Sequence, residues 1–179
     1  MNNGLSVSQD AFHLEASVPE GLVGLATDGE CGWAAWQGVS YAAVGGRNSV
    51  VLVSVTVAAL HKEVPRKEVG NASDALAARL RAKHGDAAVA QFSCADGHPG
   101  LVVRQVVAQE VNGRAVTTGQ AQALVAYPGA RALGVVSGVA LDPADLDRAA
   151  ELVAEIASGM TITSAAAAAL PRGAERVRR

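Results

Sequence analysis

The chain has 179 residues, a formal net charge of −2 and 50% hydrophobic residues, and this length supports one domain that buries roughly 70% of its unfolded surface. Met1–Val18 lacks the basic start and apolar core of a signal peptide, and no later stretch holds 18 uninterrupted apolar residues, so we expect a cytoplasmic protein without a membrane span. Cys31 and Cys94 lie far apart without a C-x-x-C pattern, so the sequence signals neither a disulfide framework nor a zinc site.

The charges are unevenly distributed along the chain. Met1–Gly46 contains five acidic residues and no Lys or Arg, whereas Arg47–Lys83 contains seven basic residues and three acidic ones. Two oppositely charged poles could orient a partner. The alternative is a chance scatter of surface charge.

Alternating apolar and polar residues predict the strands of the first half. Phe12–Val18 reads as a half-buried strand, and we expect the polar residues Met1–Asp10 before it to be frayed. After the turn Pro19-Glu20-Gly21, the pattern predicts a short continuation of the strand at Leu22–Ala26. A loop that holds both tryptophans follows at Thr27–Gly38. A strong hairpin then pairs Ser40–Val44 with Ser49–Leu60. The second hairpin strand carries its valines on one face.

The middle of the chain predicts one helix. Lys62–Val69 is charged and contains Pro65, so we expect a loop there. Asn71 or Ser73 can cap a helix that runs through His84 and that Gly85 stops. The outer face of this helix is basic.

The second half predicts further antiparallel strands. Ala87–Ser93 reads as a strand and Ala95–Gly100 as a turn. Asn112-Gly113 joins Leu101–Val111 to Arg114–Tyr127, because both residues tolerate the positive φ of a type I′ turn.

The closing segment predicts a turn, a strand and an amphipathic helix. Pro128–Arg131 makes the turn, and the strand that follows has a bulky face and a face of Ala and Gly, against which a helix can approach closely. Asp142 reads as the N-cap of the helix and Gly159 as its end. The spacing predicts a buried stripe of Leu146, Ala149, Ala150, Val153, Ile156, Ala157 and Met160, and a solvated face of Asp145, Asp147, Arg148, Glu151 and Glu155.

Together these elements predict an α+β fold. An antiparallel sheet of six or seven strands is covered by helices, in one domain of residues 1–163. Residues 164–179 form an alanine-rich and then basic tail that we expect to be flexible.

This order of elements, with a central helix opening at Asn71 and the closing run Tyr127–Met160, resembles the PsbP-like fold between about Phe12 and Thr163. That fold is shared by photosystem extrinsic subunits, Ran-binding Mog proteins and actinobacterial LpqN-type lipoproteins. The resemblance implies an αβα sandwich in a group whose known members mostly bind, stabilise or chaperone other proteins. No signal-sequence pattern or lipobox cysteine is visible in the sequence, so we do not expect the envelope location of the lipoprotein branch.

Two places carry residues of the kinds that enzymes use. Cys31 lies in a flexible Gly-rich segment, and a thiolate there would need a nearby histidine or helix N-terminus to lower its pKa. Cys94, Asp96 and His98 cluster in one turn, but a further ligand set for a metal is missing. His13, His61 and His84 are scattered, and no nucleotide-binding glycine motif is present. We therefore predict no catalytic residue, cofactor or metal.

Trp33 and Trp36 are the candidates for protein interaction. On one helical turn both indoles would point the same way, and tryptophans are favoured anchors at interfaces. The alternative is a lid that packs on the sheet edge.

The leading hypothesis is a non-enzymatic bacterial module that binds another protein as a chaperone, adaptor or assembly factor, with a homodimer as one form. One alternative is a small-molecule or hydrolytic site near Cys31 or Asp96/His98. Another is weak nucleic-acid binding by the basic Arg47–Lys83 face and the tail, which holds Arg172, Arg176, Arg178 and Arg179 but no interleaved aromatic residues.

Overall fold

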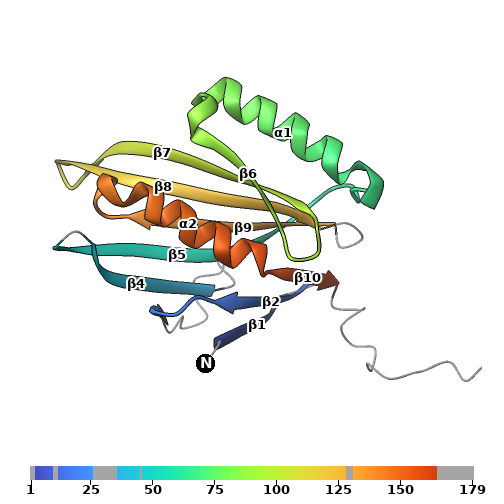
Figure 1. The fold of residues 1–179 in the computed structure, drawn as a ribbon, viewed down its shortest axis with the longest axis horizontal. Helices are drawn as coiled ribbons and strands as arrows, with labels where there is room; N and C mark the ends of the chain where they lie inside the picture. Colours follow the sequence, from blue (N-terminus) through green and yellow to red (C-terminus); the bar gives the residue numbers. More distant parts are fainter. Residues whose placement is uncertain (1–2, 10–11, 26–35, 45, 128–130, 165–179) are drawn as a thin grey trace, which may run out of the picture.

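The computed structural model describes residues 3–9, 12–25, 36–44, 46–127 and 131–164. These residues form an antiparallel seven-stranded sheet of order β3-β4-β5-β9-β8-β7-β6, a three-stranded sheet of order β1-β2-β10, and two α-helices (Figure 1). The strands are β1 Asn3–Gln9, β2 Phe12–Val18, β3 Leu22–Gly24, β4 Trp36–Val44, β5 Arg47–Ala59, β6 Val89–Ser93, β7 Pro99–Val111, β8 Arg114–Tyr127, β9 Ala132–Ala140 and β10 Thr161–Ser164. The helices are α1 Val69–His84 and α2 Leu146–Ser158. The predicted α+β class and the antiparallel sheet are confirmed.

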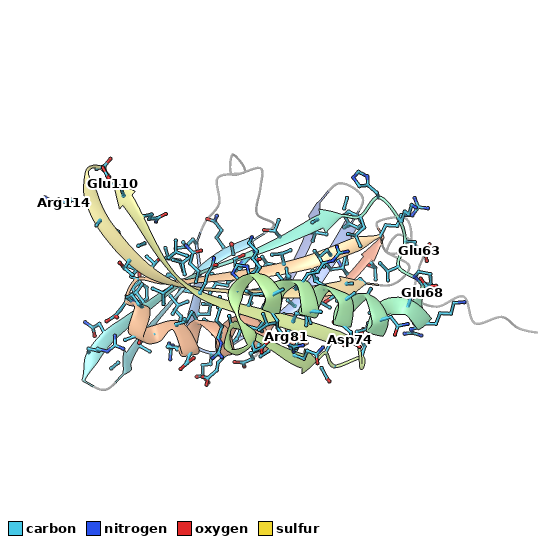
Figure 2. The ribbon with its side chains drawn as sticks, turned by 90° about the horizontal axis from the view of Figure 1, so that it is seen from above. Glu63, Glu68, Asp74, Arg81, Glu110 and Arg114 are labelled. Carbon is cyan, nitrogen blue, oxygen red and sulfur yellow. The ribbon has the colours of Figure 1, made fainter. Side chains whose placement is uncertain are left out.

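Tight turns fix the register of the large sheet. Asn112 and Gly113 both have positive φ, 51° and 74°, and they join β7 to β8 as the Asn-Gly pair predicts. Beyond the ends of β6 and β9, the two strands continue as a two-stranded arm whose tip carries Glu110 and Arg114 (Figure 2). The predicted β4–β5 hairpin is also confirmed.

Small residues let α2 lie close to one face of the sheet. A Cβ atom added to Gly138 in β9 would come within 2.8 Å of Val153 Cγ1, and one added to Gly119 in β8 within 3.1 Å of the Leu146 Cβ. The side chains predicted for the inner stripe of α2 are buried, apart from the half-buried Leu146. The hydrophobic core therefore lies between α2 and the face of Ala and Gly, as expected.

The first turn before α2 differs from the prediction. Asp142 caps it, accepting a hydrogen bond from the Ala144 N–H at 2.9 Å. However, Asp145 does not face water: its side chain is only 1% exposed and accepts two hydrogen bonds from Arg47, at 2.7 and 3.1 Å. Pro143–Asp145 form a 3₁₀ turn, which has three residues per turn and so directs Asp145 toward the start of β5. Arg148, which was also expected to face water, is half-buried and donates to Ser40 Oγ at 2.8 Å.

The other helix, α1, covers the opposite face of the sheet at its β6–β7 side. It begins at Val69 after a 3₁₀ turn, so the predicted caps Asn71 and Ser73 lie inside it and the prediction of its start is wrong. Its end at Gly85, with φ of 89°, is confirmed. Only Val69 and Ala77 of this helix are buried, which makes its packing much weaker than that of α2.

Three predictions for the N-terminal part are wrong. Asn3–Gln9 is not frayed but pairs with β2, whose other neighbour is β10. Backbone hydrogen bonds to β2 hold this strand, and its side chains do not show the apolar alternation by which a strand is predicted from sequence. Leu22–Gly24 forms a separate strand of the large sheet, and Trp36–Gly38 belongs to β4 rather than to a loop. The tail 165–179 and most of the turn Pro128–Arg131 lie outside the described residues.

The Gly138→Ala substitution tests the close approach of α2. The added methyl group would meet the buried, β-branched Val153, so we expect a loss of about 1–3 kcal/mol in the free energy of unfolding. Gly70→Ala in α1 is the matched control, because nothing lies within 4 Å of its added Cβ and the helix should gain about 0.5–1 kcal/mol. Urea denaturation measures both. Equal effects of the two substitutions would contradict the close packing of α2 against Gly138.

Candidate functional site

A large part of the sheet face opposite α2 lacks a covering helix. Among the described residues, α1 packs mainly on β7 and β6, while α2 and β2 lie on the other side. No described helix therefore covers the outward side of β3, β4, β5 and β9, although Val39 of β4, which lies on this side, is only 3% exposed. We call this surface the open face.

The open face is apolar. Of the eight large hydrophobic side chains that are exposed in the described part of the chain, five belong to these strands or to the residue that follows one of them. Tyr41 is 64% exposed, Leu141 54% and Leu52 42%, and Val23 and Leu25 complete the group. Exposed apolar surface that is contiguous over several strands is typical of interaction sites.

The same strands are nearly free of charge. The segments of β3, β4 and β9 contain no Asp, Glu, Lys or Arg. β5 contains only Arg47, which is engaged with Asp142 and Asp145. A surface without charges loses little hydration energy when a partner covers it, and depletion of charged residues distinguishes the centres of interfaces.

A groove of about 340 Å³ borders the open face beside the end of α1. Its floor carries four polar side chains from three neighbouring strands, and two hydrogen bonds connect them in pairs. Gln105 Nε2 donates to Gln120 Oε1 at 3.4 Å, and Gln122 Nε2 donates to Ser137 Oγ at 3.2 Å. Leu80, Val103 and Val139 also line the groove, together with Lys83 and His84 of α1. We call it the glutamine groove.

The sequence did not single out these glutamines. Gln120 and Gln122 lie two apart in β8 among small residues, and such spacing places both on one side of a strand. This signal was available, but only the register shows that Gln105 and Ser137 lie opposite them.

Trp36, one of the two predicted interaction residues, does not lie on the open face. It begins β4 opposite Val55, whose side chain is in the core, and it is half-buried against that core. Its Nε1 would lie 3.5 Å from a Cβ added to Gly24 in β3. This position fits the alternative of an indole packed on the sheet edge. Trp33 lies outside the described residues.

The Cys94 turn brings together the groups expected there. His98 Nε2 lies 3.3 Å from Asp96 Oδ2, and both residues border an open hollow of about 490 Å³ that Tyr127 also lines. Burial, and then the charge of Asp96, raise the pKa of the Cys94 thiol to about 11. The Tyr127 hydroxyl donates to the Met160 carbonyl at 2.6 Å, and burial, followed by the charges of Cys94 and Asp96, raises its pKa. Cys94 is thus protonated at neutral pH and a weak nucleophile. Cys31 lies outside the described residues.

The basic residues of Arg47–Lys83 do not form one surface. Arg47 opens β5 and binds Asp142 and Asp145, whereas Lys62 follows the far end of this 13-residue strand. Among the described residues, no group of three or more His, Cys, Asp or Glu side chains is placed to hold a metal ion. No helix in the described part of the chain is long and apolar enough to span a membrane.

No protein-family model matches the sequence, and no curated protein is significantly similar to it. The resemblance to PsbP-like proteins therefore stays a prediction.

The raised pKa of the Cys94 thiol predicts a loss of stability in alkaline solution. Its pKa is 9.0 in the unfolded chain and about 11 in the fold. The protonated thiol therefore makes its full contribution to the free energy of unfolding below pH 9, and this contribution is lost as the pH rises through 11. Between these values the free energy of unfolding should fall by about 2 kcal/mol more in the wild type than in Cys94→Ala. Chemical denaturation at several pH values measures this difference. Parallel pH profiles of the two proteins would show that burial does not perturb the thiol.

Proposed function

We propose that this protein is a non-enzymatic binding module of the bacterial cytosol, which acts as a chaperone, adaptor or assembly factor. Its partner, another protein, packs against the open face. The observation that carries this proposal is the combination of exposed apolar side chains and missing charges on one side of β3, β4, β5 and β9.

Sheet-on-sheet packing is a common way to cover such a surface. Two sheet faces pack about 10 Å apart with their side chains interdigitated. A partner that offers an apolar strand face, or a second copy of the chain, would bury Tyr41, Leu52 and Leu141 together. Burial of these side chains provides the driving force for association.

The proposal also agrees with the PsbP-like resemblance, which implies a protein-binding sandwich. The antiparallel sheet with α1 and α2 on opposite faces is the architecture that this resemblance implies. A fold alone does not determine function, so the support comes from the open face.

The two alternative functions have weaker support. Covalent hydrolysis at Asp96 and His98 would need a protein nucleophile, and the nearby thiol of Cys94 is buried and protonated. Nucleic-acid binding would need a continuous basic surface, and Arg47 is held in ion pairs away from Lys62.

The experiment compares Leu52→Asp with Val106→Asp as baits in extracts of the native host. Both replace an exposed aliphatic side chain in a strand, but Val106 pairs with Gly119 on the side of the sheet that faces α2, away from the open face. An aspartate at the centre of the interface would be buried without a partner, so we expect at least tenfold less captured protein with Leu52→Asp and an unchanged amount with Val106→Asp.

Light scattering of each purified protein identifies the case in which the captured partner is a second copy. Melting curves check that both variants fold. Equal capture by the two variants would contradict binding through the open face.

A further inference from the structure

We propose that the glutamine groove binds an extended peptide segment of the partner, in which a carboxylate side chain lies near an aliphatic one. This inference rests on the proposed function and adds the chemistry of the partner. The groove and the open face form one continuous surface, because Val139 lines the groove and pairs with Leu52 of the open face.

The floor of the groove offers donors and acceptors that match a peptide backbone. The Gln105–Gln120 hydrogen bond uses the Gln105 Nε2 and the Gln120 Oε1, so Gln105 Oε1 and Gln120 Nε2 remain for a ligand. In the second pair, Gln122 Oε1 and the hydroxyl hydrogen of Ser137 remain in the same way. A side-chain amide can accept from a peptide N–H and donate to a peptide C=O, which are the groups that an extended segment presents.

The lining residues disfavour other ligand classes. Sugars and nucleobases are usually stacked on aromatic rings, and no Phe, Tyr or Trp is among the described residues that line the groove. Phosphate groups are usually held by several Arg, Lys or backbone N–H groups together, and Lys83 is the single Lys or Arg among the described residues of the lining. A peptide needs neither feature.

The charge near the groove favours an acidic group in the peptide. Lys83 lines the groove, and no Asp or Glu is among the described residues of its lining. The last ten residues of α1 carry Arg79, Arg81 and Lys83 and no acidic residue, and Figure 2 shows Arg81 on this helix. A carboxylate beside Lys83 would therefore lie in a positive field.

The strand register gives the direction of the bound segment. One row across the sheet, perpendicular to the strands, reads Gln105, Gln120, Val139, Leu52, Val39 and Val23, of which Val39 is buried. The row changes from polar to aliphatic between β8 and β9. Neighbouring strands lie about 4.8 Å apart, and an extended chain rises about 3.3 Å per residue. The acidic side chain and the aliphatic side chain over Leu52 should thus be roughly three to five residues apart.

A displayed library of random twelve-residue peptides tests the groove. After selection on the wild-type chain, we expect enriched peptides to carry Asp or Glu three to five residues from Leu, Ile or Val. Their affinity should fall at least tenfold for Gln120→Leu and remain unchanged for Gln109→Leu, which alters an exposed glutamine of the arm. Lys83→Glu should shift the enriched charge from acidic to basic.

The outcomes separate this inference from the proposed function. The inference is overturned if no peptide is enriched, or if the enriched peptides bind Gln120→Leu and Lys83→Glu as they bind the wild type. The inference is also overturned if Leu52→Asp loses partner capture while the two groove variants capture the partner normally. That result would still support binding through the open face. Melting curves of Gln120→Leu and Lys83→Glu confirm that loss of binding is not loss of folding.

Discussion

The close contact between α2 and the sheet determines how the two faces of the sheet are used. The Ala and Gly residues of β9 leave room for Val153 and its neighbours, so α2 packs closely against the backbone of the sheet. Such packing excludes water and places the largest part of the core on one side of the sheet. A β-strand alternates its side chains, so the bulkier residues of β9, Leu133, Val135 and Val139, point to the other side. β9 thus directs most of its larger aliphatic side chains toward a face that α1 covers only in part.

This arrangement explains why the open face, rather than a cluster of ionisable groups, is the best candidate for function. The acidic and basic groups with defined partners mostly have structural roles: Arg47 holds the turn before α2, and an unpaired buried Asp145 would cost several kcal/mol. Asp96 accepts a hydrogen bond from the backbone N–H of His98 within its own turn. By contrast, the glutamines of the groove have hydrogen-bonding groups that no described residue satisfies, and Val139 beside them pairs with the exposed Leu52.

Local chemistry predicted those parts of the fold that depend on neighbours in sequence. The Asn112-Gly113 turn, the Asp142 cap and the small face of β9 each follow from residues a few positions apart. Features that depend on distant partners escaped prediction. The strand of residues 3–9 exists because β2 offers its edge, and Asp145 is buried because Arg47, 98 positions away, reaches it. The glutamine groove arises from three strands and one helix, and its lining cannot be read from any single segment.

The most direct measurement of the open face is photochemical carbene labelling read by mass spectrometry. Labelling should be strong at Tyr41, Leu52 and Leu141 in the purified chain, and weak at the buried Val51 and Val53. Addition of native host extract should reduce labelling of the first three side chains and leave that of Val106 unchanged. Weak labelling of the open face in the purified chain, or equal labelling with and without extract, would contradict its role as a binding surface.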